Sequence, residues 1–351
     1  MKKIFVFLGV VLMTIGSAVR AQEVDSSAPL QKSSWGDAKK SEVIDYIPDV
    51  SLDMRGFYNH DFTTGTGLLN GDGLYLNIDG YISENFSYSF NHRLASTYYE
   101  DNSGFNGTNW LTLTYEVGDF SVTAGKDALF VGSFEYDAYD LDTYYEMNST
   151  FYNMFDCWQW GLSAAWYPDE SNSVLIQAAL SPYRTEEEQN MFSYAAGWRS
   201  EYDFYESYWT VNMWEYEKGR FVKALNLSNR FHIGDFSCDL EYMTRASDLK
   251  NFFINDFTAI IAPSYNIGDW VRVFAKCGFE RVREEAMFED FDANLFYGAG
   301  VEFFPLKEDK DIRVHAAWTS NDFFGDILNV GLTWKMDLTR AAKHLFHISD
   351  K

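Results

Sequence analysis

The chain has few of the residues on which several common protein classes are built. It contains only three cysteines, an odd number without Cys-x-x-Cys spacing, which argues against a disulfide framework and a zinc site. Only six prolines occur in 351 residues, and no low-complexity stretch divides the chain. Beyond the first 21 residues, no apolar run approaches the roughly 18 residues expected of a membrane-spanning helix. The sequence therefore excludes a helical membrane protein and gives no sign of a flexible linker between domains.

Basic residues are scarce as well, with 28 Lys and Arg against 52 Asp and Glu, for a net charge of −24. Residues 1–21 carry two lysines, an apolar run over 4–16 and small residues up to Ala21, the pattern of a secretory signal peptide. The apolar run is too short for a retained membrane helix. Cleavage after Ala21 removes three bases and no acid, which takes the net charge to −27. So acidic a chain is a poor partner for nucleic acid.

Aromatic residues and alternating patterns are abundant instead. Phe, Tyr and Trp make up 18% of the chain, a load that is hard to place in a soluble acidic domain. Three related stretches, YEVGDFSVTAGK, FHIGDFSCDLEY and YNIGDWVRVFAK, place Gly-Asp between segments that alternate apolar and polar residues. Gly-Asp signals a hairpin turn because Gly readily adopts positive φ, and a period of two is typical of half-buried strands. The stretches predict tight hairpins at Gly118, Gly234 and Gly268.

The same alternation along the rest of the chain predicts sixteen strands, each long enough for a tilted membrane strand. They cover residues 51–60, 73–83, 86–98, 109–117, 120–131, 156–167, 174–183, 192–204, 206–216, 223–233, 236–247, 253–266, 270–283, 294–304, 312–321 and 326–338. Links after even-numbered strands are short, and most links after odd-numbered strands are longer, as in DFTTGTGLLNGDG.

This asymmetry predicts an all-β fold, a transmembrane antiparallel β-barrel of about 16 strands with short periplasmic turns and longer extracellular loops. The phenylalanines and tryptophan next to the three Gly-Asp turns are expected in an aromatic girdle at the periplasmic interface. A soluble β-sandwich or propeller is the alternative, for which shorter strands and more polar outward faces are expected.

In a membrane barrel the apolar face of each strand meets lipid and the polar face lines the lumen. The basic residues that fall on polar faces are Arg55, Arg93, Arg199, Arg230, Arg245, Arg272, Lys276, Arg313 and Lys335. Lys126 joins them only if a bulge near Gly125 turns it inward, because simple alternation points it at lipid. Two roles remain open for these bases: a path for anionic solutes, or pairing with acids on neighbouring strands. Acids expected on the same wall are Asp53, Asp79, Glu201, Asp239, Glu241, Glu280 and Glu302.

The excess acid falls in predicted loops, at 135–146, 186–188 and 284–292, either as solvated loop residues or as an acidic rim. The longest link, GSFEYDAYDLDTYYEMNSTFYNMFD, starts at Gly132 and is too aromatic to dangle in water. It is expected to fold into the lumen and narrow the passage, with an external lid as the alternative. The residues expected at the constriction are Glu135, Tyr136, Asp137, Tyr139 and Tyr144.

The segment VTAGKDALFVGSFEYDAYDLDTYY resembles the strand and inward loop of the phosphate-selective porin O and P family. This resemblance implies a sixteen-stranded diffusion channel, usually a homotrimer, in which basic residues guide anions. The expected organisation is a signal peptide (1–21), a periplasmic linker (22–48), a barrel (49–338) and a C-terminal tail (339–351). The expected partners are outer-membrane lipid and lipopolysaccharide and small hydrophilic solutes.

The resulting prediction is a porin in the outer membrane of a Gram-negative bacterium, with a weak preference for anions such as phosphate and no cofactor. A non-conducting structural or adhesive barrel is the alternative. An enzyme is not expected, although Asn226, Ser228 and His232 share one face of a strand and are residue types found in hydrolases. Positions i and i+4 on a strand lie about 13 Å apart, too far for the hydrogen bond that a nucleophile and its base require.

Overall fold

The computed structural model describes residues 46–94, 107–185, 188–247, 252–282, 291–306 and 310–346. The predicted signal peptide (1–21) and nearly all of the predicted linker (22–48) lie outside these residues. No helix in the described ranges is long and apolar enough to cross a membrane.

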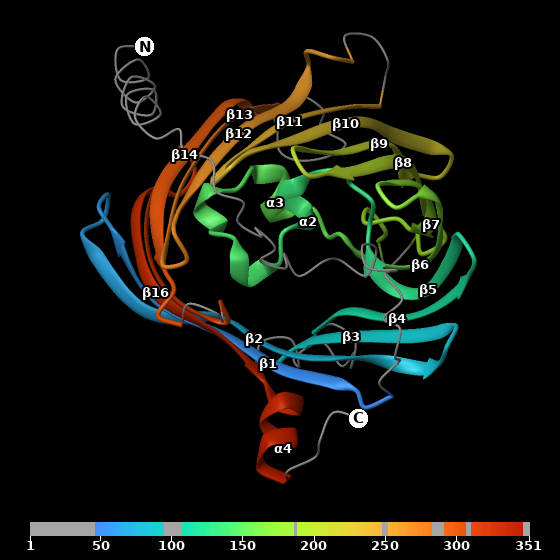
Figure 1. The fold of residues 1–351 in the computed structure, drawn as a ribbon. Helices are drawn as coiled ribbons and strands as arrows, with labels where there is room; N and C mark the ends of the chain where they lie inside the picture. Colours follow the sequence, from blue (N-terminus) through green and yellow to red (C-terminus); the bar gives the residue numbers. More distant parts are fainter. Residues whose placement is uncertain are drawn as a thin grey trace.

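Sixteen antiparallel strands form a closed barrel in which every strand pairs with its neighbours in sequence and β1 pairs with β16 (Figure 1). The predicted fold class is confirmed. The strands are β1 (Asp49–Asp61), β2 (Thr66–Ser83), β3 (Phe86–Arg93), β4 (Thr108–Val117), β5 (Phe120–Ala128), β6 (Trp158–Asp169), β7 (Asn172–Leu180), β8 (Phe192–Tyr202), β9 (Tyr205–Glu217), β10 (Arg220–Ile233), β11 (Phe236–Ala246), β12 (Asp256–Ile267), β13 (Val271–Val282), β14 (Phe291–Phe303), β15 (Ile312–Asn321) and β16 (Gly325–Asp337).

The two faces of the wall are inverted relative to a soluble protein. On β6, Trp160, Leu162 and Trp166 are exposed on the outside, whereas Gln159 and Ser163 are buried inside. The same contrast holds around the wall, where polar side chains such as those of Asn, Thr and Ser dominate the buried positions of the strands. An apolar outer surface suits lipid, and a polar inner surface suits a water-filled lumen.

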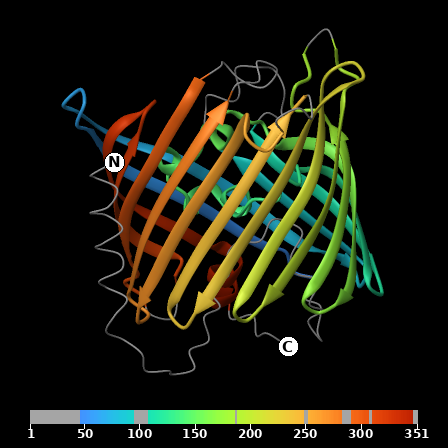
Figure 2. The same ribbon diagram turned by 90° about the horizontal axis from the view of Figure 1, so that it is seen from above.

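The three Gly-Asp turns lie at one end of the barrel, called here the turn rim, because each follows an even-numbered strand. Gly118, Gly234 and Gly268 have φ of 56°, 60° and 58°, and a Cβ at any of them would meet nothing within 4 Å. Glycine is therefore required by its backbone angle and not by lack of space. The third turn is one residue longer than predicted, because Ile267 pairs with Val271 across Gly268–Trp270. Figure 2 shows these tight turns at the lower end of the tilted strands.

The opposite end, the loop rim, differs from the prediction at the first hairpin. The stretch DFTTGTGLLNGDG is mostly strand: β2 begins at Thr66, and β1 and β2 extend together beyond their neighbours (Figure 2). A register shift beside Arg55 and Gly56 accommodates one extra residue of β2. Glycines and asparagine obscured the alternation there, so the expected long loop is a four-residue turn, 62–65.

The link between β5 and β6, residues 129–157, is called the inward loop because it lies inside the ring of strands (Figure 1). It contains α2 (Phe134–Asp137), the 3-10 turns η3 (Asp140–Asp142) and η4 (Tyr145–Met147), and α3 (Thr150–Met154). Four clusters of buried hydrophobic side chains join it to the wall. The core of this protein is therefore the contact between the inward loop and the wall.

The tail predicted at 339–351 begins as a helix, α4 (Leu338–Phe346), directly after β16. Thr339 joins it to the start of β1, because its Oγ1 accepts a hydrogen bond from Val50 N at 2.8 Å and donates one to Pro48 O at 2.8 Å. The Asp337 side chain accepts from Arg340 N at 2.7 Å and caps the helix. α4 lies outside the barrel (Figure 1).

Candidate solute pathway

Serine caps give the inward loop its short helices. Ser133 Oγ accepts from Glu135 N at 3.2 Å at the start of α2, and Ser149 Oγ accepts from Tyr152 N at 3.0 Å at the start of α3. Helices this short are not stable alone in water, so their conformation depends on packing against the wall.

Apolar contacts hold the loop at separate places around the lumen. Phe151 and Phe155 pack against Trp214 of β9, with ring centroids 5.7 and 4.8 Å away. At η4, Tyr144 stacks on Phe274 of β13 at 5.2 Å, with the two rings only 3° from parallel. Tyr139 packs against Tyr75 of β2, with ring centroids 5.6 Å apart. Contacts with β2, β9 and β13 fix the loop across the lumen and leave it little freedom to swing out.

The loop also carries five acids and no base between Gly132 and Phe155, and the wall opposite it is basic. Glu135 accepts from Lys276 Nζ at 2.5 Å, and Asp137 from Arg199 Nη1 at 3.0 Å. Asp140 accepts from Arg93 Nη2 at 3.0 Å. The side chains of Glu135, Asp137 and Asp140 are each 16% exposed or less. These acids, expected in a solvated loop or an acidic rim, therefore lie against the wall instead.

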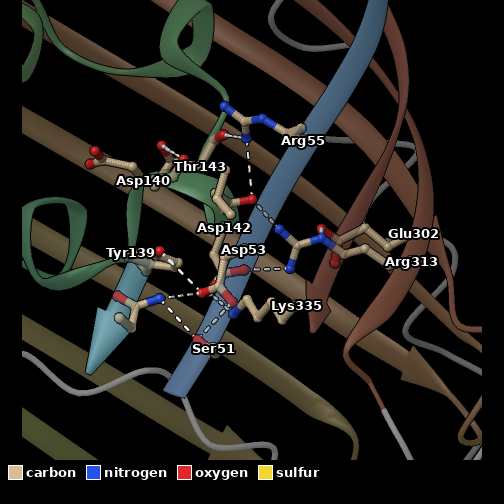
Figure 3. Close-up of polar contacts among 12 residues, drawn as sticks. Ser51, Asp53, Arg55, Tyr139, Asp140, Asp142, Thr143, Glu302, Arg313 and Lys335 are labelled. Carbon is tan, nitrogen blue, oxygen red and sulfur yellow. Dashed lines mark hydrogen bonds and ion pairs between the residues drawn. The ribbon is translucent and has the colours of Figure 1, made fainter. Parts of the chain in front are cut away.

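The most connected of these contacts lies where β1, β15 and β16 meet (Figure 3). Asp142 accepts from Arg313 Nη1 at 2.5 Å and from Lys335 Nζ at 3.1 Å. Arg55 Nη1 donates to the backbone carbonyls of Leu141, at 3.2 Å, and of Thr143. Burial alone would raise the pKa of Asp142, but Lys335 and Arg313 hold it well below its usual value. The carboxylate therefore stays charged at neutral pH and binds two strands at once.

The structure divides the ten predicted pathway bases into three groups. Six contact the inward loop with a hydrogen bond or ion pair: Arg55, Arg93, Arg199, Lys276, Arg313 and Lys335. Two pair with acids directly opposite on the neighbouring strand, Arg230 with Asp239 at 2.6 Å and Arg272 with Glu302 at 3.4 Å. The remaining two, Arg245 and Lys126, differ from the rest.

Arg245 is fully buried beneath α3. Its guanidinium lies 4.6 Å from the ring centroid of Phe151, and its Nη1 donates to Thr258 Oγ1 at 3.0 Å. It is a structural support of the loop, out of reach of a passing solute.

Lys126 is on the outside, contrary to its place in the predicted pathway. It pairs with Leu111 on β4 and Trp160 on β6, which belong to the outward face, and neither strand pair has a register shift near Gly125. The bulge that would turn Lys126 inward is absent from these described strands, and Asp127, not Lys126, is turned inward and buried. Its long stem lets the amine reach the interface from the end of β5.

The five predicted constriction residues lie between the loop and the wall. Tyr139 Oη donates to Asp53 Oδ2 at 3.1 Å, Tyr144 Oη to Glu302 Oε1 at 3.1 Å and Tyr136 Oη to Phe151 O at 2.7 Å. Glu135 and Asp137 are bound to wall bases as described above. These side chains fix the position of the loop more than they project into an open passage.

A cavity of about 260 Å³ remains between the loop and the wall at β4–β6. Its charged lining residues are Arg93, Asp137, Asp140 and Asp156, and its rings include Trp110, Tyr145, Tyr152 and Trp158. The sequence did not single out Trp110 and Trp158, because they occur in strands, where an aromatic residue is usually assigned to a lipid girdle. This cavity is the candidate path beside the loop.

The described residues show no site for metal or acyl-transfer chemistry. In the described ranges no group of three or more His, Cys, Asp or Glu is placed to hold a metal ion. His232 Nε2 lies 2.8 Å from Glu206, and Ser228 Oγ donates to Glu241 at 2.8 Å. Each side chain therefore has an acidic partner of its own, and the two do not form a nucleophile–base pair.

Comparisons with known proteins agree with this geometry. Residues 49–207 match the family model of phosphate-selective porin O and P, which confirms the resemblance noted in the sequence. Similar solved structures include a loop-deletion mutant of OmpT from Vibrio cholerae, with 12% identity over 83% of this chain and 100% of that chain and a TM-score of 0.58. A mutant of the Rh. blastica porin has 12% identity over 83% and 100% of the two chains, with a TM-score of 0.54. At such identities these likenesses show the fold. No curated protein gives a significant match.

Proposed function

From a sixteen-stranded porin barrel whose first half matches the porin O and P family, we propose that this protein is an outer-membrane porin of a Gram-negative bacterium. It is a diffusion channel for small hydrophilic solutes. The observation that carries this function is the inverted barrel wall, apolar outside and polar inside, with a loop fixed across its lumen. A barrel of this strand number is wide enough for an aqueous channel, and the inward loop narrows it.

The outer surface is suited to outer-membrane lipid and lipopolysaccharide as partners. Exposed Trp, Phe, Leu and Val side chains follow the outward positions of the strands. One similar structure, OmpT of Vibrio cholerae, is described as a trimer. We extend that assembly to this chain as a homotrimer, to be tested by mass measurement in detergent.

The weak anion preference predicted from the sequence remains a prediction. Fewer bases are available to attract anions than the number on the wall suggests, because most wall bases are paired with carboxylates. Among the paired bases of the predicted pathway, Arg272 keeps the most exposed side chain, at 40%. Reversal potentials in a salt gradient test the preference. A cation preference unaltered by Arg93→Gln, Arg199→Gln and Arg230→Gln would remove the bases from the solute path.

A non-conducting barrel is the second candidate, favoured by the anchoring of the loop on several sides of the lumen. Single-channel recording of the purified protein separates the two functions: a porin gives discrete conductance steps, and a plugged barrel gives none. Deleting Asp137–Asn148 is expected to raise the conductance markedly because it removes η3 and most of the loop acids. Unchanged conductance in a folded deletion variant would show that the loop does not limit the passage.

A further inference from the structure

The cavity beside the inward loop has two aromatic sides. Trp110 and Trp158 come from the wall, with ring centroids 5.5 Å apart. The loop contributes Tyr136, Tyr145 and Tyr152. The ring centroid of Tyr152 lies 5.1 Å from that of Tyr136 and 6.3 Å from that of Tyr145. Burial raises the pKa of Tyr136 and Tyr152 well above the usual value, so both remain neutral phenols. A flat ligand can thus meet neutral π-faces from the wall and from the loop.

Two of the three acids that line the cavity are paired with arginines. Arg93 is paired with Asp140 at 3.0 Å, and Asp137 with Arg199 at 3.0 Å. The remaining lining acid, Asp156, accepts from the Gln159 amide at 3.0 Å. A phosphate would meet carboxylates here, and a simple cation would find Asp137 and Asp140 already bound by arginines. A neutral ligand meets neither penalty.

A hydrogen-bond donor in the lining is unused. Asn109, 8% exposed, lines the cavity, and its Nδ2 has no hydrogen-bond partner among the described residues. A buried amide donor of this kind normally has a partner, so the site offers a hydrogen bond to a ligand. Together with paired carboxylates, which have lone pairs to spare, it provides both donors and acceptors.

We propose that this cavity binds a neutral sugar, a mono- or disaccharide stacked between the aromatic residues of the wall and of the loop. One face of a sugar ring presents C–H groups to π-faces, and its hydroxyl edge presents donors and acceptors to Asn109 and the paired acids. The volume of about 260 Å³ is slightly below the range of about 300–1,000 Å³ typical of drug-sized ligands, which suits one or two sugar rings. This proposal rests on the proposed channel function and names its solute class.

Glucose and maltose are the probes, applied to the full-length protein in planar bilayers and in tryptophan-fluorescence titrations. Each sugar is expected to interrupt the KCl current and to change the fluorescence with the same half-saturating concentration. Phosphate and choline at equal concentrations are expected to do neither.

Trp158→Ala is expected to weaken sugar binding about two- to tenfold, the range of an aromatic contact. Asn109→Leu is expected to weaken it as well. Trp160→Ala, two residues along β6 on the outward face, is the matched control and should bind sugar as the native chain does.

The outcomes separate the two proposals. A normal KCl current that neither sugar affects, without a fluorescence change, refutes the sugar site and leaves the porin function intact. A fluorescence change in a protein that carries no current refutes the channel and leaves the sugar site. Equal effects of Trp158→Ala and Trp160→Ala, or interruption by choline or phosphate but not by sugar, also refute the sugar site.

A second inference rests on α4 alone. Its barrel-facing side is small: Thr339 is buried against β1 and Ala342 is half-buried. The flank of the helix beside this side exposes Leu338, Ala341 and Leu345, whose spacing of three and four residues forms one apolar stripe. Leu345 is 73% exposed, so this stripe is not used by the barrel.

The position of α4 indicates what covers the stripe. The helix starts directly at the end of β16, whose outward side chains, such as Leu332 and Trp334, belong to the lipid-facing surface. It projects outward from the wall beside β1 (Figure 1) and lies near the turn rim (Figure 2), so its axis runs across the barrel axis. Arg340 and His344 are exposed on the side of α4 that faces away from the barrel, where they place basic groups along one edge of the stripe. An amphipathic helix in this orientation, with a basic polar face, is typical of a membrane interface.

We infer that α4 lies in the lipid interface at the turn rim, with its apolar stripe among acyl chains and its basic groups at anionic headgroups. Spin labels test this in a variant in which the three cysteines are alanine, reconstituted in phosphatidylethanolamine–phosphatidylglycerol vesicles. Labels at Leu345→Cys and Ala341→Cys are expected to be more accessible to oxygen than to a water-soluble nickel chelate. A label at Arg340→Cys is expected to show the reverse.

A label at Leu332→Cys, on the outward face of β16, is the internal control for lipid contact. If Leu332→Cys reports lipid while both stripe positions report water, the inference about α4 is wrong and the membrane barrel stands. If Leu332→Cys also reports water, the membrane location of the barrel itself fails. Dipolar coupling between Leu345→Cys labels of two chains would show that a second copy covers the stripe, which also overturns the inference.

Discussion

At the scale of single residues, Asp142 shows how charge fixes the inward loop. Its carboxylate is bound by Arg313 and Lys335, from two different strands, and its side chain is only 13% exposed. Removing one member of a buried pair leaves the partner charges without compensation. We therefore expect Asp142→Asn to lower the free energy of unfolding by roughly 2 kcal/mol, the range of hydrogen bonds to charged groups. Urea unfolding in detergent measures the difference.

The matched control is Glu217→Gln. Glu217 pairs with Arg220 at 2.6 Å, but both side chains are more than half exposed. Such surface pairs contribute about 0–1 kcal/mol. Equal effects of the two substitutions would contradict the role assigned to Asp142.

The same residue sets a pH dependence. Because Lys335 and Arg313 hold its pKa below the unfolded value, which is about 3.9 for Asp, Asp142 stabilises the folded chain above about pH 4. This stabilisation is lost as the pH falls through the lower pKa of the folded state. We expect the native chain and Asp142→Asn to differ by a constant amount between about pH 7 and 5, and to converge below about pH 4. Unfolding midpoints across this range check the sign, and convergence on raising the pH instead would contradict it.

At the scale of elements, two glycines on β4–β5 have different requirements. Gly118 in the turn has φ of 56° and open space, whereas Gly125 has φ of 143° and a Cβ there would lie 2.1 Å from the carbonyl oxygen of Leu111. Gly118→Ala is expected to cost about 1 kcal/mol, the usual penalty for a positive φ. Gly125→Ala has to move the backbone of β4 and is expected to cost more than this or to prevent folding. Folding yield and urea midpoints compare the two, and Gly118→Asn should restore much of the loss.

At the scale of the whole molecule, the strong negative charge and the ion preference of the channel have different origins. The acids at 186–187 and 284–290, expected near the loop rim, lie outside the described residues, while Glu135, Asp137, Asp140 and Asp142 of the inward loop are paired with wall bases. Charge beyond the narrow passage is screened within about 8 Å at physiological salt and within about 30 Å at 0.01 M. We expect the reversal potential to move toward cation preference as salt is lowered from about 1 M to 0.01 M. A reversal potential independent of salt would assign selectivity to the lumen alone.

Strand number, order of the hairpins and the inverted faces followed from the sequence because period-two alternation and turn residues act locally. Gly118 and Gly234 identified their turns through a backbone angle that other residues avoid. The local rule failed where alternation was interrupted, as in the β1–β2 hairpin. It held at Lys126, which simple alternation points at lipid and which stays on the outward face because the strands keep their register.

Only the tertiary structure decided what the polar residues do. The acidic loop and the basic wall were both visible in the sequence, yet Asp142, Arg313 and Lys335 are separated by up to 193 residues and meet only when the barrel closes. The cavity beside Trp110 and Trp158 likewise arises from the position of the loop, which no local pattern specifies. Backbone conformation is determined by neighbours in the chain, whereas ion pairing and cavity shape are determined by contacts across the lumen.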